Sequence, residues 1–131
     1  MKNNILDECM RKAIRLNPYH PEQKSGYHHF SFIVQDHKVL GYGENHGGFI
    51  MNPKIQMFAS YQKTHSEVAV WFKVKGLLNR MKSFELVNIR LNKDNGIKMS
   101  KPCKCCWNFM KSLGCKSFWF TTDIGWGRIS L

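Results

Sequence analysis

Acidic side chains are scarce in this chain of 131 residues, and long apolar runs are missing. Asp and Glu number 9 against 20 Lys and Arg, which gives a formal net charge of +11. No apolar run approaches the ~20 residues that a membrane span requires. The first eight residues hold no apolar stretch of the kind found in secretory signals. We therefore expect no signal peptide, no membrane partner and an intracellular location, in the cytoplasm, nucleoid or nucleus.

Internal repeats and low-complexity tracts are also lacking, and the composition excludes disorder. Hydrophobic residues make up 43% of the chain and aromatic residues 13%, whereas disordered chains contain few apolar side chains. The length suits one domain, because domains run to roughly 100–200 residues. We therefore expect residues 1–131 to form a single domain.

The positive charge is concentrated in the second half of the chain. Residues 1–72 hold 8 Lys/Arg and 6 Asp/Glu, a net charge of +2, whereas residues 73–131 hold 12 Lys/Arg and 3 Asp/Glu, a net charge of +9. Such asymmetry is typical of proteins that bind a polyanion, such as nucleic acid or an anionic membrane. A solvated lysine-rich surface would give the same numbers, so charge alone leaves both interpretations open.

The cysteines do not follow the pattern of a disulfide framework. Their number is odd, and three of the five fall within four residues: Cys9, Cys103, Cys105, Cys106 and Cys115. A secreted disulfide framework would use an even number spread along the chain. Tight clustering in an intracellular chain favours metal binding or redox chemistry instead.

Hydrophobic periodicity predicts helices and strands in alternation. Apolar residues at spacings of three and four predict helices over 4–16, 64–81 and 103–113. β-prone segments predict strands over 29–34, 39–43, 85–91, 116–122 and, after a turn at 123–127, 128–131. This order predicts an α/β fold in which helices cover both faces of a sheet. Only eight residues follow Asp123, too few for a parallel crossover, so the terminal strand should run antiparallel to its predecessor.

Two short motifs each open a predicted helix. The first, His-Ser-Glu at 65–67, directly follows Thr64, which we predict to be the helix N-cap in a capping box with Glu67. The second, Pro-Cys-Lys-Cys-Cys at 102–106, has its two outer cysteines three residues apart. Side chains at that spacing share one helix face.

These motifs together provide a candidate zinc site. Cys103 and Cys106 lie at a predicted helix N-terminus, which favours thiolate over thiol. With His65 they make three protein ligands and leave the fourth tetrahedral position to water, as in catalytic zinc sites. Glu67 is then placed to take a proton from that water, whose pKa zinc lowers to around 7.

Other interpretations of the cysteines remain open at this point. Cys103 and Cys106 could form a redox pair, although the surrounding βαβ context of such pairs is missing. A structural zinc site with four cysteines would need Cys9 or Cys115, and neither belongs to a second C-x-x-C. Cys105 points to another helix face, and we expect it, like Cys9 and Cys115, to be a packed side chain.

The combination of H-x-E and P-C-x-x-C, each opening a helix with a strand between, is the pattern of zinc-dependent nucleobase deaminases. The chain resembles the cytidine deaminase-like superfamily over about residues 28–131. That resemblance implies a three-layer α-β-α fold with a mixed sheet of about five strands. It also implies Zn²⁺ as cofactor and hydrolytic attack of activated water on C4 of cytosine or C6 of adenine, with Glu67 moving the proton.

The resemblance implies further roles and shows two departures. Asn45, at the end of the second strand, matches an Asn that contacts sugar or base in many members, and His46 beside it is a second candidate. Most members have Ala or Val where this chain has Ser66, a small change that we expect to be neutral. The short segment after the fourth strand is closer to nucleoside deaminases than to polynucleotide deaminases, which continue to a fifth parallel strand.

The substrate is the least determined feature. Lys101 and Lys104 flank the proposed site, and Trp126 falls in the predicted turn where polynucleotide deaminases contact the neighbouring base. A basic groove with aromatic side chains is typical of single-strand binding. We therefore expect cytosine deamination in single-stranded DNA or RNA, including RNA editing. The alternatives are a free nucleoside or nucleotide (cytidine or dCMP), or adenine in RNA. A binding module without turnover is disfavoured by the intact ligand set, and the oligomeric state is left open.

Overall fold

The computed structural model describes residues 3–19, 27–45 and 65–130. Its helices are α1 (Asn3–Leu16), the short 3-10 helix η1 (Asn17–Tyr19), α3 (Ser66–Val74) and α4 (Lys104–Ser112). Its strands are β1 (Tyr27–Gln35), β2 (Lys38–Glu44), β3 (Phe84–Asn92), β4 (Ile97–Lys98), β5 (Cys115–Thr122) and β6 (Gly125–Ser130).

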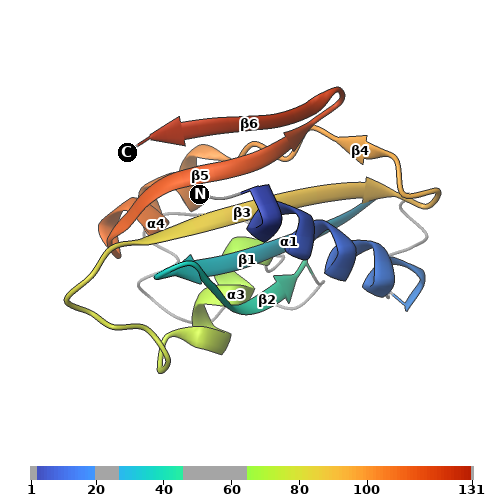
Figure 1. The fold of residues 1–131 in the computed structure, drawn as a ribbon. Coiled ribbons are helices and arrows are strands. Elements are labelled where there is room, and N and C mark those ends of the chain that lie inside the picture. Colours follow the sequence, from blue (N-terminus) through green and yellow to red (C-terminus); the bar gives the residue numbers. More distant parts are fainter. Residues whose placement is uncertain (1–2, 20–26, 46–64, 131) are drawn as a thin grey trace.

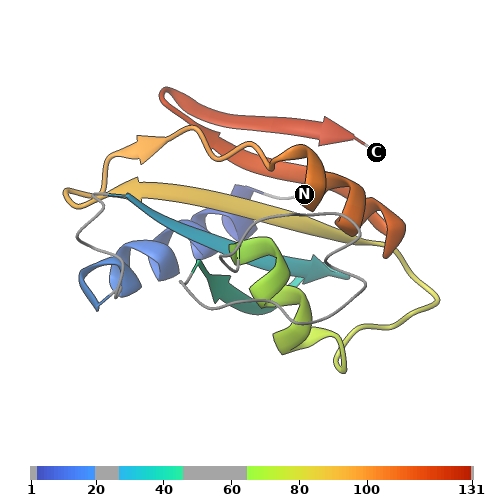
Figure 2. The same ribbon diagram turned by 180° about the vertical axis from the view of Figure 1, so that it is seen from behind.

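The strands form one mixed sheet in the order β2-β1-β3-β5-β6, with β4 paired to β3 outside this path. Only β3 and β5 pair in parallel; the other pairs are antiparallel, including β5 with β6. Helix α1 covers one face of the sheet, and α3 and α4 cover the other (Figures 1 and 2). The predicted three-layer α-β-α fold with an antiparallel terminal strand is therefore confirmed, and β4 is an additional strand.

Two predicted boundaries are wrong by at least three residues. The second helix ends at Val74 rather than near residue 81, and Leu77 and Met81 beyond it are 66% and 92% exposed. Their spacing continued the helical pattern without any core to contact. The last strand begins at Gly125 because Thr122 pairs directly with Gly125, so the turn needs only two residues and is shorter than predicted.

The middle of the α1 face of the sheet is apolar. Strands β1 and β3 alternate their side chains between the two faces, as the pleat requires. On the α1 side they direct bulky apolar residues against the helix, forming a cluster of Ile5, Leu6, Cys9, Ala13, Phe30, Phe32, Val34, Val87, Ile89 and Leu91. All of these side chains are buried.

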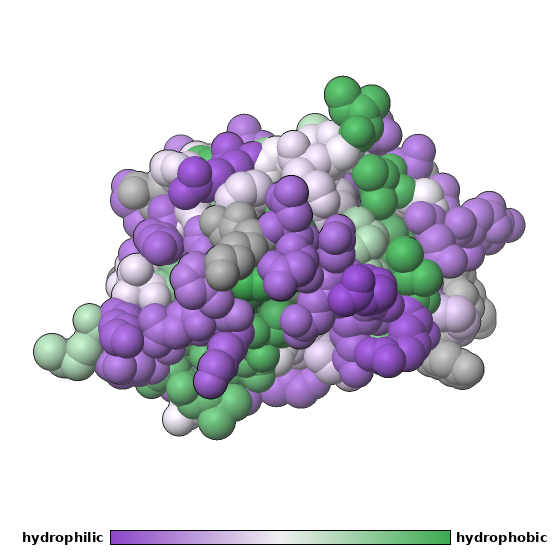
Figure 3. Space-filling view, in the orientation of Figure 1, coloured by the Kyte–Doolittle hydropathy of each residue, from purple (hydrophilic) through white to green (hydrophobic). Residues whose placement is uncertain are grey.

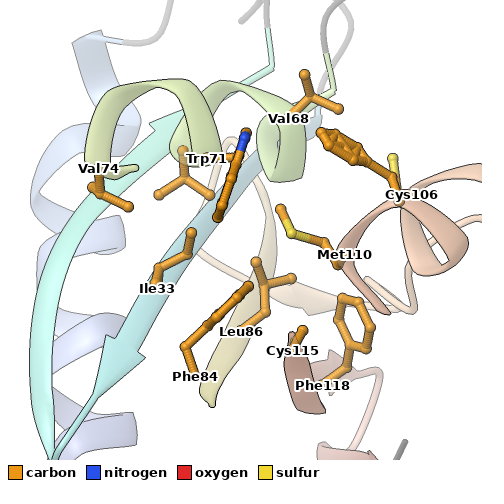
Figure 4. Packing of buried hydrophobic residues seen from close by; sticks show 12 residues of the cluster. Ile33, Val68, Trp71, Val74, Phe84, Leu86, Cys106, Met110, Cys115 and Phe118 are labelled. Atoms are coloured by element: carbon orange, nitrogen blue, oxygen red, sulfur yellow. The ribbon is translucent and has the colours of Figure 1, made fainter. Parts of the chain in front are cut away.

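The opposite face holds a second apolar cluster beneath α3 and α4. Figure 4 shows its side chains filling the space between the two helices and the sheet, with Trp71 and Val74 from α3 facing Ile33, Phe84 and Leu86. From α4, Cys106, Phe109 and Met110 complete it. This packing fixes the two helices, and hence their N-termini, relative to the sheet.

Helix α3 lies very close to strand β2, and a glycine makes this possible. A Cβ added at Gly43 would stand 2.8 Å from the Ser66 carbonyl oxygen and 2.9 Å from the Ala69 carbonyl carbon, and would also meet the Val70 backbone nitrogen. No side chain tolerates such contacts with helix backbone. Gly43 is therefore required for the observed distance between β2 and the first turn of α3.

Among the helices of the described residues, none is long and apolar enough to cross a membrane. The outer surface on the α1 side is largely hydrophilic (Figure 3).

Candidate active site

The two motifs meet at the adjacent N-termini of α3 and α4. His65 occupies the N-cap of α3 in an extended conformation and makes no side-chain cap hydrogen bond. The predicted N-cap at Thr64 is thus wrong by one residue, and Thr64 lies outside the described residues. Cys103 is the N-cap of α4, where its Sγ accepts a hydrogen bond from the Cys106 backbone N–H at 3.4 Å.

The side chains of His65, Cys103 and Cys106 converge on one point. The His65 Nδ1 lies 3.8 Å from Cys103 Sγ and 3.4 Å from Cys106 Sγ, and all three ligand atoms lie within 4.8 Å of one another. A tetrahedral zinc ion with ordinary Zn–S and Zn–N bonds separates its nitrogen and sulfur ligands by about 3.5 Å. The observed separations lie on both sides of that value, so the three residues fit a zinc ion.

The electrostatics of the cluster also suit a cation. The hydrogen bond with the Cys106 side chain, together with those from His65 and the Cys106 backbone, lowers the pKa of the Cys103 thiol to about 4, against the opposing effect of burial. The contact with Cys103 in turn raises the pKa of His65. A thiolate at neutral pH is the form that binds zinc.

Glu67 lies in the first turn of α3 and is buried. Its Oε2 accepts a hydrogen bond from Asn88 Nδ2 at 3.2 Å, and its Oε1 accepts one from the Ser66 hydroxyl at 3.2 Å. Burial raises the pKa of the carboxyl above its usual value, against the lowering effects of a hydrogen bond with its own backbone, the charge of His65 and the hydrogen bond from Asn88. The Glu67 carboxylate is thus hydrogen-bonded inside the fold, and the predicted capping partner Thr64 lies outside the described residues.

Two polar residues near Glu67 were not predicted from the sequence. Asn88 of β3 and Ser31 of β1 are both buried and face α3. A signal was available, because each is a polar residue at an inward position of an otherwise apolar strand. Which face of each strand α3 covers could not be assigned before the pairing of β1 with β3 was known.

The residues predicted to contact substrate do not all lie near the cluster. Asn45 directly follows β2; its Oδ1 accepts from the His29 backbone N–H at 3.0 Å, and its own N–H donates to the His29 carbonyl at 3.3 Å. His46 lies outside the described residues. Lys101 and Lys104 are exposed on either side of Cys103.

Trp126 lies apart from these residues. It belongs to strand β6 rather than to a turn, and it packs partly buried against the apolar cluster on the α1 side. The cluster of His65, Cys103 and Cys106 lies on the opposite face, at the N-termini of α3 and α4. The structure therefore does not bring Trp126 together with His65, Cys103 and Cys106.

The remaining cysteines take no part in the cluster. Cys9 packs on the α1 side and Cys115 beneath α4, and burial raises the pKa of each thiol to about 12. Cys105 is partly exposed. Within the described residues, one group of three or more potential ligands could hold a metal, and none of these cysteines belongs to it. A four-cysteine zinc site is thereby excluded for Cys9 and Cys115.

No protein-family model matches the chain, and no curated protein matches it in sequence. Solved structures do match. The apo dCMP deaminase of cyanophage S-TIM5 superimposes with a TM-score of 0.59 at 17% identity, over 93% of this chain and 86% of that chain. The same enzyme in complex with dCMP and dUMP gives 0.57 at 16% identity, over 92% and 82%.

A cytidine deaminase from Mycobacterium leprae gives a TM-score of 0.57 at 15% identity, over 94% of this chain and 92% of that chain. At sequence identities this low, the structural match establishes the fold alone. The chain therefore has the cytidine deaminase-like fold, as the two motifs predict.

Proposed function

We propose that this chain is a zinc-dependent hydrolase that deaminates a nucleobase, converting cytosine to uracil with release of ammonia. The observation that carries this proposal is the position of buried Glu67 two residues from His65, in a cluster whose ligand spacing fits zinc. A metal with an open position beside a carboxylate that is not a ligand is the arrangement that hydrolytic deamination requires.

Each residue then has a distinct role. His65, Cys103 and Cys106 would hold the ion, which when bound lowers the pKa of a water molecule to around 7. Glu67 takes a proton from the attacking water, passes it to the ring nitrogen and assists departure of the amine. Its raised pKa suits this role, because a general acid–base group works best when its pKa lies near the working pH.

We infer that the substrate is cytosine in a free nucleoside or nucleotide. The antiparallel pairing of β6 with β5 supports this choice, because it corresponds to the nucleoside deaminase branch that the sequence resembles. One solved relative was crystallised with dCMP and dUMP. Asn45 would contact sugar or base through its amide nitrogen, since its oxygen already accepts a hydrogen bond from His29. His46 is a second candidate beside it.

Single-stranded nucleic acid is the second candidate substrate. Exposed Lys101 and Lys104 next to Cys103 favour it, as does the +9 charge of residues 73–131. The position of Trp126 on the other face of the sheet weighs against it.

One experiment distinguishes the candidates. Purified protein is incubated with cytidine, dCMP, single-stranded DNA and tRNA, and the products are identified by mass. We expect turnover of cytidine or dCMP, and none with the Glu67→Ala variant. Turnover of a polymer alone would overturn the free-nucleotide assignment, and equal activity of Glu67→Ala would overturn the mechanism. Polymer binding, if present, should weaken steeply as salt rises.

A further inference from the structure

A chain of buried hydrogen bonds runs from the sheet to Glu67. The Ser31 hydroxyl donates to Asn88 Oδ1 at 2.6 Å and contacts the Ser66 hydroxyl at 2.7 Å. Asn88 and Ser66 each bond one oxygen of the Glu67 carboxylate. Ser31, Ser66, Asn88 and Glu67 are all buried, so these groups depend on one another for hydrogen bonds.

The orientation of the Asn88 amide is determined by its partners. Ser31 donates to its oxygen, and its nitrogen donates to Glu67 Oε2 and to the Ser100 carbonyl, each at 3.2 Å. Rotating the amide by half a turn would place its oxygen against the Glu67 carboxylate and against a carbonyl. Ser31 thus opposes the rotation, because a flipped amide would present N–H groups where Ser31 needs an acceptor.

The Ser66 hydroxyl links Ser31 to the other oxygen of the Glu67 carboxylate. It has one proton and two neighbouring acceptors, the Ser31 oxygen at 2.7 Å and Glu67 Oε1 at 3.2 Å. Ser31 already gives its proton to Asn88, so the single Ser66 proton is shared between the Ser31 oxygen and Glu67 Oε1 in a three-centre hydrogen bond. Ser66, which we expected from the sequence to be neutral, therefore belongs to the polar environment of Glu67.

We propose that Asn88 and Ser31, with Ser66, are positioning residues that hold the Glu67 carboxylate in the orientation needed for proton transfer. Asn88 acts directly on Glu67, and Ser31 acts through Asn88. This inference rests on the proposed deaminase function for its kinetic consequences. The hydrogen-bond chain itself can be tested without turnover.

The kinetic test uses Asn88→Asp and Ser31→Ala. Asn88→Asp keeps the shape of the side chain but places a carboxylate oxygen where Glu67 has a donor, and Ser31→Ala removes one of the three hydrogen bonds that orient the Asn88 amide. A general acid–base group contributes about 10²–10⁴-fold, so we expect kcat to fall about 100-fold for Asn88→Asp and about 10-fold for Ser31→Ala. KM should stay within about twofold, because substrate binding is not the interaction removed.

The double variant tests the order of action. If Ser31 acts through Asn88, the Ser31→Ala/Asn88→Asp protein should lose about as much kcat as Asn88→Asp alone, because residues that act as a unit are non-additive. Rates are expressed per zinc-loaded molecule, so partial unfolding cannot imitate the effect. Losses that multiply, or a KM that rises in step with the fall in kcat, would overturn the proposal.

Ser117→Ala is the matched control. Ser117 is an equally buried strand serine that donates to a carboxylate, Glu85, at 2.6 Å on the other side of the sheet. We expect its loss to lower the melting temperature and leave kcat unchanged. An equal fall in kcat for Ser117→Ala and Ser31→Ala would reduce the effect to general destabilisation and overturn the positioning role.

A spectroscopic readout separates this proposal from the proposed function. The side-chain amide resonances of Asn88 in a ¹H–¹⁵N spectrum should move in Glu67→Gln and in Ser31→Ala, and stay in place in Ser117→Ala. Unchanged resonances in the first two variants would overturn the proposal even if the protein is an active deaminase. If the wild-type protein turns over no cytosine substrate, the proposed function fails. The Asn88 resonances then still show whether the hydrogen bonds from Ser31 through Asn88 extend to Glu67.

Discussion

The two faces of the central sheet share the same strands but differ in chemistry. Towards α1, β1 and β3 present only apolar side chains in their middle sections, such as Phe32 and Ile89. Towards α3 and α4, the alternate positions of the same strands carry Ser31 and Asn88 among apolar neighbours. One face therefore stabilises the fold, and the other combines packing with a buried polar group.

The difference shows where the fold accepts an energetic cost. Burying polar groups is unfavourable unless they are hydrogen-bonded, and an apolar replacement for Asn88 would serve packing as well as Val87 does on the other side. In the middle of β1 and β3 the buried polar residues gather instead around Glu67, whereas the Ser117–Glu85 pair on the α1 side lies near the start of β3. Local departures from the packing pattern are expected at functional sites.

The largest expected effect compares two buried carboxylates, one near each face. Glu67→Gln should lower kcat by about 10²–10⁴-fold while leaving zinc content unchanged, because it removes the proton carrier but no ligand. Glu85→Gln is the matched control, since Glu85 is buried among Ser117 and Trp119 and has no place in the mechanism. Comparable losses of kcat in the two variants would contradict the distinction between the faces.

The next effect concerns the metal. Cys103→Ser should weaken zinc binding by more than about 100-fold, since even partners of ligands contribute 10–100-fold. Cys105→Ser, two residues away and outside the cluster, should keep one zinc per chain. Metal content is measured by atomic emission after dialysis against a weak chelator. Zinc retained by Cys103→Ser, or lost by Cys105→Ser, would contradict the ligand assignment.

A smaller effect tests the apolar face. Ile89→Val removes one methylene from the fully buried α1-side cluster, and such changes cost about 0.5–1.5 kcal/mol of unfolding free energy. Turnover per folded molecule should not change, because no polar partner of Glu67 is touched. Urea unfolding and steady-state kinetics on the same samples measure both quantities. A changed kcat at full folding would mean that the two faces are coupled.

The smallest effect depends on pH. Hydrogen bonds from Ser117 and Trp119, with the charge of Lys116, outweigh burial and lower the pKa of Glu85 below its usual value. A carboxyl with a lowered pKa in the folded state stabilises it above the unfolded pKa near 4.5, and this contribution disappears as the pH falls through the folded pKa.

The difference in unfolding free energy between wild type and Glu85→Gln should thus be about 1 kcal/mol or less at neutral pH, in favour of wild type. It should shrink as the solution is acidified below pH ~4.5. A difference that grows on acidification would contradict the sign of the pKa shift.

Much of the fold and of the metal cluster could be predicted from the sequence. The order of elements followed from periodicity, and the cluster followed from residue types at fixed spacing. The features that were predicted wrongly, or not at all, depend on tertiary contacts. Strand β4 spans only two residues, too few to show a period, and Leu77 kept helical spacing although no surface was there to bury it. The roles of Asn88 and Trp126 required knowing which face each strand position occupies.

Gly43 sets the distance between strand β2 and the helix that carries His65 and Glu67. The first turn of α3 rests directly on the backbone of β2, with the Ser66 carbonyl too close for even one methyl group at position 43. Ser66 is the residue between His65 and Glu67. Contact with the edge strand β2 therefore limits how closely the first turn of α3 approaches the sheet, and so fixes the positions of both side chains. A single added carbon at Gly43 would therefore push the first turn of α3 away from β2 and displace His65 and Glu67 together.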